Sequence, residues 1–165
     1  MSDAPLVPGS VAEHTICLLL KLGQVAFRLT EDDLDELGLR VRHYSILQAL
    51  ADDGPQPQVG LGGYLRIDPA TMASSLDTLE SAGYVARVRD QQDRRRYVVE
   101  ITREGTAVLG RVNGKLDQLD DRVFADLGNA DRASLHRLLT GLNSGSVMPA
   151  LFDTAREPTG TRKDS

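Results

Sequence analysis

The sequence has little of the chemistry that builds disulfides, thiolate metal sites and aromatic stacking platforms. Its 165 residues include one cysteine, no tryptophan and only 4% aromatic side chains. A single cysteine forms neither an internal disulfide nor a thiolate cage, so we expect a cytoplasmic protein. We also predict no metal site and no cofactor. The longest apolar stretch, residues 16–29, is interrupted by Lys21, Gln24 and Arg28. We therefore expect no membrane span and, because the first ten residues lack a basic leader, no signal peptide.

Patterns that mark common catalytic sites are missing too. The sequence contains no Gly-x-Ser-x-Gly, no His-Glu-x-x-His and no phosphate-binding loop. Residues 60–63 (GLGG) are rich in glycine, but no predicted strand precedes them and no lysine follows them. We therefore predict no catalytic residues and do not expect an enzyme.

Charge is distributed unevenly along the chain. Hydrophobic residues make up 41% and charged residues 26%, which allows a packed core for one domain with a modest addition. Acidic residues outnumber basic ones by 24 to 19, and the net charge of −5 argues against a general coat on nucleic acid. Residues 84–103 nevertheless carry +3, which leaves −8 on the rest of the chain. The net charge therefore does not exclude a local basic site.

Long amphipathic helices are expected toward both ends of the chain. Apolar residues over 11–29 cover more than one face of a helix, and those over 105–127 keep one stripe at helical spacing. A third helix is expected from Asp131 up to Gly145. Residues 1–10 and 153–165 lack such periodicity, so we expect a flexible N-terminal arm and a flexible C-terminal tail.

The segment between those helices predicts three short helices followed by two strands. In chain order, the helices are expected at 41–51, 59–65 and 69–82, and the strands at 84–89 and 97–101. Asp68 is a predicted N-cap before Pro69, Gly83 is the glycine that ends this helix, and Thr102 is expected to cap the helix that follows. This order is that of a winged helix-turn-helix. The predicted fold class is therefore mainly α with a small β wing, plus a separate layer of flanking helices.

Two stretches of this segment resemble the MarR family of bacterial transcriptional regulators. Leu61–Val85 is similar to the family's two helices that end in Leu-Glu-x-x-Gly and two hydrophobic residues, and DQQDRRR followed by YVVEITREG is similar to its wing signature. The resemblance covers about residues 12–145. Gly60, Gly62 and Gly63 depart from the family pattern, which usually has good helix formers there, so we expect the first of the two helices to be short or frayed.

The resemblance implies a domain organisation, an assembly and a function. It implies a winged helix-turn-helix DNA-binding domain at 38–103 and a helical dimerisation region made of 11–37 and 104–152. The protein is then expected to be a ligand-responsive repressor that binds a pseudo-palindromic operator in double-stranded DNA as a homodimer. The alternatives are a winged-helix module that binds proteins, and a regulator that senses oxidants through Cys17. Because apolar residues surround Cys17 in the sequence, we favour a buried, unreactive thiol.

The candidate DNA-binding residues lie on the helix after Asp68 and on the turn between the strands. The helix offers short polar side chains that suit a major groove, although a merely solvated face has the same composition. They are Thr71, Ser74, Ser75 and Thr78. The turn offers three consecutive arginines that suit the negative potential of a minor groove, namely Arg94, Arg95 and Arg96. We expect Asp93 to hold one arginine, while Arg94 or Arg96 reaches DNA.

Two further clusters carry polar chemistry. In the family, small anionic or phenolic effectors bind near the junction of the first helix with the DNA-binding domain, and a cationic, partly aromatic cleft suits such ligands. The candidates there are His14, Arg40, His43 and Tyr44, for which half-buried packing and surface ion pairs are the alternative. Residues 31–36 contain five acids. We expect them at the start of a helix, where the dipole favours negative charge, rather than around a metal.

Overall fold

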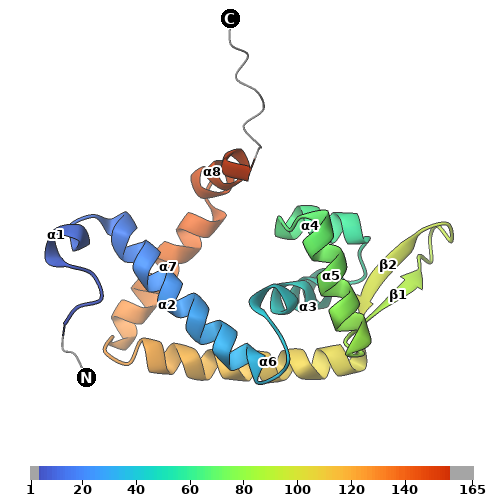
Figure 1. The fold of residues 1–165 in the computed structure, drawn as a ribbon, viewed down its shortest axis with the longest axis horizontal. Helices are drawn as coiled ribbons and strands as arrows, with labels where there is room; N and C mark the ends of the chain where they lie inside the picture. The colour runs from blue at the N-terminus through green and yellow to red at the C-terminus, as the bar shows by residue number, and fades with distance from the viewer. Residues whose placement is uncertain (1–3, 157–165) are drawn as a thin grey trace, which may run out of the picture. The chain divides into compact units, whose positions relative to one another are not determined.

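The structure, a computed structural model, describes residues 4–156 of the chain. The chain divides into two compact units, Met1–Asp121 and Arg122–Ser165. The first unit holds the three short helices and both strands of a winged helix-turn-helix, together with the helices that precede them (Figure 1). The described residues are mostly helical and contain one two-stranded antiparallel sheet, which confirms the predicted fold class.

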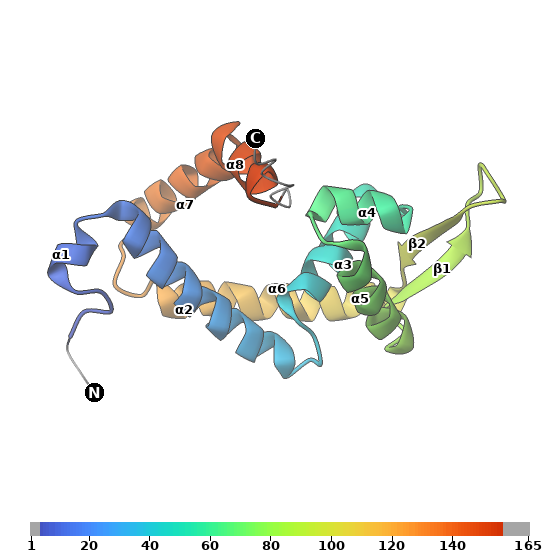
Figure 2. The same cartoon turned by 45° about the horizontal axis from the view of Figure 1, so that its top comes forward.

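The winged helix-turn-helix forms in the predicted order. Its elements are α3 (Val41–Asp53), α4 (Gln58–Leu65), α5 (Pro69–Ser81), β1 (Val85–Arg89), β2 (Tyr97–Ile101) and α6 (Arg103–Val123). The two strands form a hairpin that extends away from α3, α4 and α5 (Figures 1 and 2). Arg89 pairs with Tyr97 across the hairpin, and Gln56 adds an antiparallel bridge to Val99. One apolar core joins these elements, and its fully buried members include Ile46, Leu47, Leu61, Leu76 and Val112.

Three local signals expected from the sequence are present. The Asp68 carboxylate accepts a hydrogen bond from the Thr71 N–H at 2.9 Å and so caps α5. Gly83 has a φ of 78°, a left-handed conformation that suits glycine, and α5 ends just before it. The Thr102 hydroxyl accepts from the Gly105 N–H at 3.0 Å and donates to the Gly83 carbonyl at 2.6 Å. Thr102 therefore caps α6 and ties it to the end of α5.

Gly105 lets α6 pass very close to the base of the hairpin. A Cβ atom at this position would overlap the Tyr84 carbonyl oxygen and would lie 2.8 Å from the Ile101 side chain. Any larger residue must therefore push α6 away from the hairpin, or distort the chain at Tyr84. Position 105 therefore requires glycine, because the main chain at Tyr84 leaves no room for a side chain.

The helix predicted over 11–29 is in fact two helices. They are α1 (Gly9–Ala12) and α2 (Thr15–Asp35). His14 precedes α2 without a side-chain hydrogen bond to its N-terminus, so no capping signal marked the break in the sequence. The predicted arm, residues 1–10, is helical from Gly9 onward, and its residues 1–3 lie outside the described part of the chain.

The acidic run lies at the C-terminal end of α2, so the prediction that it opens a helix is wrong. The Glu31 carboxylate accepts hydrogen bonds from the Val41 N–H at 2.8 Å and from the Arg40 guanidinium at 3.2 Å. It therefore lies at the positive end of the dipole of α3. The Glu36 carboxylate accepts from the Lys115 ammonium group at 2.6 Å, and this interaction lowers the pKa of Glu36. The acids thus join α2 to α3 and to α6.

The second unit contains α7 (Asn129–Ser144) and α8 (Val147–Arg156). The first of these helices was predicted and the second was not. Residues 153–156 belong to α8, so the boundary of the predicted tail is wrong there, and residues 157–165 lie outside the described part of the chain. The Arg132 guanidinium donates to the Phe124 carbonyl at 3.0 Å, which closes the turn before α7.

Candidate nucleic-acid interface

Helix α5, here called the recognition helix, has an apolar face in the core and a polar face in water. The apolar residues expected to pack inward are buried, namely Met72, Leu76 and Leu79. On the other face Ser74 and Thr78 are exposed one turn apart, and Thr71 is half-buried in the first turn. Short hydroxyl side chains on an exposed helix face are able to reach base edges in a major groove.

Ser75 does not belong to this polar face. Its side chain is only 1% exposed, and its hydroxyl donates a hydrogen bond to the Thr71 carbonyl at 2.7 Å. The prediction that Ser75 contacts DNA is therefore wrong, because the helix turns this side chain into the core. Ser74 and Ser75 are adjacent and chemically identical, so only the position of the core distinguishes them.

The exposed hydroxyls are oriented by the recognition helix itself. Ser74 donates to the Thr71 carbonyl at 3.2 Å, and Thr78 donates to the Ser74 carbonyl at 2.9 Å. With its hydrogen directed at the main chain, each hydroxyl oxygen keeps lone pairs for another donor. These side chains are therefore suited to accept from exocyclic amino groups, which adenine and cytosine present in the major groove.

Arg87, on β1, binds both acidic side chains of the recognition helix. Its guanidinium donates to Asp77 at 2.7 Å and forms an ion pair with Glu80, whose other carboxylate oxygen accepts the Arg87 N–H at 3.2 Å. Hydrogen bonds to Asp77 and Glu80 raise the pKa of Arg87. This group of three residues, the Arg87 clamp, neutralises the acids of the helix and fastens the helix to the hairpin. Because the side chains are partly exposed, each ion pair contributes only up to about 1 kcal/mol.

The turn between the strands is held by its own main chain and acids. The Asp90 N–H donates to the Arg96 carbonyl at 3.0 Å, which closes the hairpin. The Asp90 carboxylate accepts from the Gln92 N–H at 2.8 Å, and the Asp93 carboxylate accepts from the Arg95 N–H at 3.1 Å. Such turns fix the course of the backbone, so the arginine side chains project from a defined loop.

Arg89 braces this turn from the strand below it. Its guanidinium lies over the ring of Tyr97, 4.6 Å from the centroid, and donates to the Arg94 carbonyl at 2.7 Å. From the sequence, Arg87 and Arg89 were predicted only to add to the local positive charge, and their contacts with the helix and the turn were not predicted. The sequence did contain a signal for these contacts. Arg87 and Arg89 are two residues apart on one strand, so their side chains lie on the same face and can meet partners there.

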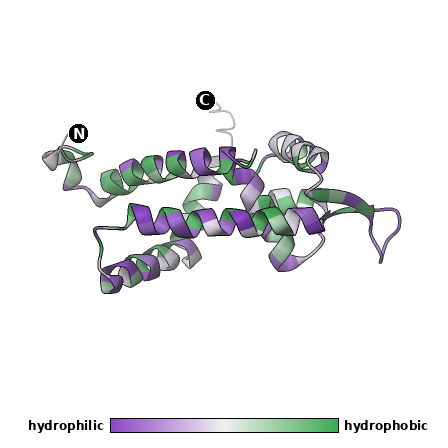
Figure 3. Ribbon diagram, turned by 90° about the horizontal axis from the view of Figure 1, so that it is seen from below, coloured by the Kyte–Doolittle hydropathy of each residue, from purple (hydrophilic) through white to green (hydrophobic). Residues whose placement is uncertain are grey.

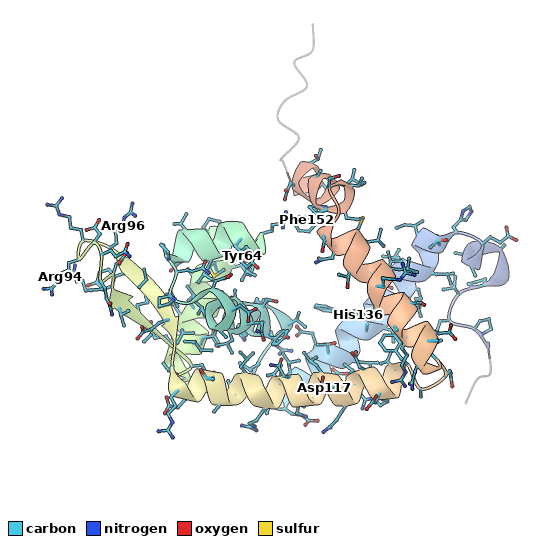
Figure 4. The ribbon with its side chains drawn as sticks, turned by 180° about the vertical axis from the view of Figure 1, so that it is seen from behind. Tyr64, Arg94, Arg96, Asp117, His136 and Phe152 are labelled. Atoms are coloured by element: carbon cyan, nitrogen blue, oxygen red, sulfur yellow. The ribbon has the colours of Figure 1, made fainter. Side chains whose placement is uncertain are left out.

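The three wing arginines are exposed at the tip of the hairpin. Figure 3 shows the hydrophilic colour of this loop, and Figure 4 shows Arg94 and Arg96 pointing away from the strands. The Arg96 side chain is 71% exposed and its Nε lies 3.8 Å from the Asp93 carboxylate, so Arg96 is the arginine that Asp93 holds, though weakly. Within residues 4–156 no ion pair engages Arg94 or Arg95. Their charge is therefore available to an external anion.

The four predicted effector-binding residues do not form one cluster. His14 lies at the N-terminal end of α2 and Arg40 lies beyond its C-terminal end, and a helix of 21 residues is about 30 Å long. Placing His14 in one site with the other three is therefore wrong. Arg40 forms ion pairs with Glu31 and Asp35, each at 3.2 Å. Its cation thus has partners within the chain.

His43 and Tyr44 occupy the inner side of α3. His43 is 4% exposed, and its Nδ1 accepts the Arg40 N–H at 3.2 Å, so the proton of the neutral ring lies on Nε2. Burial, followed by the positive charge of Arg42, lowers the pKa of His43. Tyr44 is half-buried against the core, and this burial raises the pKa of its phenol. His43 therefore acts as a packing and capping residue.

Residues 4–156 contain no group of three or more histidine, cysteine, aspartate or glutamate side chains placed to hold a metal ion. No helix among them combines the length and apolarity needed to cross a bilayer. Cys17 is a free, half-buried thiol on α2.

Comparison with known proteins agrees with this architecture. The sequence model of the MarR family matches residues 39–97. A putative transcriptional regulatory protein for the hcr operon of Thauera aromatica is 30% identical over 141 residues, which cover 84% of each chain. The HTH-type transcriptional repressor NicR of Pseudomonas putida is 29% identical over 84% of this chain and 89% of its own.

A solved structure has the same fold as this chain. It is that of a mutant MarR from E. coli complexed with operator DNA, which is 24% identical and matches with a TM-score of 0.65. The match covers 76% of this chain and 90% of that one. The family match falls on the winged helix-turn-helix, and the identity to the Thauera protein extends well beyond it on both sides. The chain therefore belongs to the MarR family of winged-helix regulators.

Proposed function

We propose that this regulator binds DNA directly, with the recognition helix in a major groove and the wing in the adjacent minor groove. One observation carries the proposal, which is that one compact unit presents an exposed hydroxyl face and an exposed arginine loop. Hydroxyl side chains suit base edges, whereas arginine suits phosphates and the negative potential of a narrow minor groove. The Arg87 clamp joins the two surfaces, so they act on DNA together.

The proposed assembly is a homodimer, because the flanking helices expose large apolar side chains. On α2, Leu34 is the buried residue, whereas Ile16 is 67%, Leu20 62% and Phe27 56% exposed. The later helices also expose apolar side chains, including Leu138, Leu142, Leu151 and Phe152. Apolar faces of this kind mark interaction surfaces. A two-fold dimer would bring two recognition helices to half-sites about one DNA turn apart, which predicts a pseudo-palindromic operator.

Repression and response to a ligand complete the proposed function. NicR, a relative over most of both chains, is a repressor, which supports the same direction of control here. A small carboxylate or phenolate at the junction of α2 and α3 would compete with Glu31 and Asp35 for Arg40, next to Tyr44. Losing those ion pairs would change how α2 holds α3. Effectors of this kind typically shift DNA affinity by about 1–3 kcal/mol of coupling. We place this regulator in the cytoplasm, where the DNA is.

The test is selection of DNA from a random duplex library by the full-length chain. We expect enrichment of one sequence with two related half-sites about one DNA turn apart. Light scattering at the same protein concentration should show that the protein is a dimer. A library that stays random through repeated rounds at moderate salt would overturn DNA recognition. It would favour a protein-binding module with the same fold.

The effector proposal needs a separate measurement on the enriched duplex. Hydroxylated aromatic acids are titrated into the complex, with uncharged analogues as the control. We expect release by an acid and no release by its amide, and Arg40→Gln should weaken the response while DNA binding without effector persists. Equal release from the wild-type and Arg40→Gln chains would overturn the assignment of Arg40.

A further inference from the structure

Hydrogen-bond donors are scarce on the recognition helix. Residues 69–81 contain no lysine, arginine, histidine, asparagine, glutamine or tryptophan. Those are the side chains that carry N–H groups, and among them are the ones that most often bind guanine and adenine in a major groove. The polar side chains of this helix are therefore hydroxyls and two carboxylates, and its means of reading bases are limited to theirs.

The exposed hydroxyls have their hydrogens directed into the helix. Ser74 donates to the Thr71 carbonyl at 3.2 Å, and Thr78 donates to the Ser74 carbonyl at 2.9 Å. The first turn is closed in the same way, because the Asp68 carboxylate accepts the Thr71 N–H at 2.9 Å. Hydrogen bonds from the side chain and main chain of Thr71 lower the pKa of Asp68. Ser74 and Thr78 therefore keep lone pairs for an external donor while their own hydrogens are engaged.

Asp77 adds a carboxylate to this exposed face. It lies three residues after Ser74 and next to Thr78, so the three side chains occupy neighbouring positions on one side of the helix. The Asp77 side chain is 68% exposed, and the Arg87 clamp holds its Oδ1 atom at 2.7 Å. The clamp thus fixes the carboxylate through one oxygen, and the other oxygen, Oδ2, lies outside that ion pair. The face formed by Ser74, Asp77 and Thr78 presents acceptors.

The bases of DNA differ in how well they match such a face. In the major groove adenine and cytosine carry exocyclic amino groups, which donate, whereas guanine presents the acceptors N7 and O6 and thymine presents the acceptor O4. Two acceptors that face each other leave both without a hydrogen, and a desolvated polar group without a partner is costly. A carboxylate matches cytosine best, because adenine places the acceptor N7 beside its amino group.

We propose that Ser74, Asp77 and Thr78 are specificity-determining residues that accept hydrogen bonds from exocyclic amino groups in each half-site. Asp77 takes the amino group of a cytosine, and the two hydroxyls take those of adenine or cytosine. Guanine is excluded at these positions, since this face has no donor for N7 and O6. Arg87 is the positioning residue for Asp77. The inference rests on the proposed DNA binding and adds to it the kind of base group that the recognition helix selects.

The test uses base analogues in the duplex that the full-length chain enriches from a random library. Purine in place of adenine, or a pyrimidinone in place of cytosine, removes the exocyclic amino group, whereas deazapurines that lack N7 remove an acceptor and keep the amino group. The same analogues in the flanking sequence control for weaker base pairing. Affinity is measured by fluorescence anisotropy for the wild type, for Ser74→Ala with Thr78→Ala, and for Asp77→Asn, and the melting temperature of each chain is recorded.

We expect removal of a contacted amino group to weaken wild-type binding about fivefold or more, which is the effect of losing one partner of a buried hydrogen bond. Duplexes with deazapurines should bind as tightly as the unmodified duplex. Ser74→Ala with Thr78→Ala should no longer respond to at least one of those amino groups. Asparagine both accepts and donates, so Asp77→Asn should still bind cytosine and should also admit guanine at that position. Asp120→Asn, at an exposed site on α6, is the matched control and should keep the exclusion of guanine.

Other outcomes would overturn the inference. If the wild type responds to removal of N7 and not to removal of amino groups, the helix donates to the bases. If Asp77→Asn melts at a lower temperature and still excludes guanine, Asp77 has only a structural role. The two proposals also fail separately. A library that stays random means that DNA binding itself is wrong, whereas an enriched duplex whose affinity ignores every amino-group analogue rejects only the proposed base readout.

Discussion

The recognition helix and the wing approach the same proposed ligand with opposite chemistry. The helix offers hydroxyls and two acids and contains no lysine or arginine, whereas residues 84–103 carry a net charge of +3. Attraction to phosphates follows the number of cations, while discrimination between bases depends on hydrogen bonding at their edges. If the proposed DNA binding is correct, the wing supplies most of the affinity and the recognition helix supplies the discrimination between bases. The Arg87 clamp then keeps the two in register.

The largest effect is expected from removing the wing charges. Replacing Arg94, Arg95 and Arg96 together by alanine should lower affinity about 1,000-fold or more at moderate salt, because a dimer loses six cations near phosphates. The loss should be similar for the operator and for a random duplex, as measured by anisotropy. Ser74→Ala with Thr78→Ala should lower operator affinity alone. If the helix variant also lost most of its affinity for random DNA, the division of roles would be reversed.

The joint between helix and wing offers the next largest effect. Gly105→Ala should lower the free energy of unfolding by about 3 kcal/mol, since the added methyl overlaps the Tyr84 carbonyl at the base of the hairpin. Gly110→Ala is the matched control on the same helix, because open space surrounds its Cβ position. That variant should gain about 0.5–1 kcal/mol from helix propensity. Urea denaturation of both measures the difference, and equal changes in the two would contradict the close approach.

Loosening the Arg87 clamp should have a smaller effect on stability and a specific effect on DNA. Arg87→Gln should cost about 1 kcal/mol or less for each of its two exposed ion pairs. It also leaves Asp77 and Glu80 unneutralised on the recognition helix, so operator affinity should fall. Adding Asp77→Asn and Glu80→Gln to the same chain should restore part of that affinity. No restoration in the triple variant would mean that the clamp does not act by neutralising these acids.

The smallest effect is expected from His43, which lies outside both surfaces. Its pKa is lower in the folded chain than the ordinary value of 6.5, so the unfolded chain binds more protons in the window just below that value. Its stabilising contribution is therefore present above pH 6.5 and is lost as the pH falls toward the folded pKa. His43→Asn should flatten this dependence in urea titrations between pH 7 and pH 5. His136→Asn, at an exposed site on α7, is the matched control substitution.

The winged helix-turn-helix was predictable because short-range signals mark its ends. The Asp68 cap, the left-handed Gly83 and the Thr102 cap act within a few residues of chain. Helix α2 was misplaced because its start carries no capping hydrogen bond. The acids at its other end satisfy partners on α3 and α6, and so belong to a helix end that periodicity alone did not reveal.

The candidate site was predictable only in part, for a related reason. Arg94, Arg95 and Arg96 form a run of charges that a hairpin tip must expose, so their position follows from the turn. Ser75 failed because the choice between a polar and a buried helix face depends on where the core lies. His14 failed because a pattern of residue types does not measure the length of the helix between them.

By itself the sequence determined the order of helices and strands, the caps that end them and the basic loop of the wing. These properties depend on neighbours within a turn or a hairpin, and such neighbours are close in any compact fold. Only the tertiary structure decided which serine faces the core, which acids Arg87 neutralises, and why Gly105 must lack a side chain. Each of those depends on atoms brought together from different elements, where packing and desolvation rather than local propensity set the free energy.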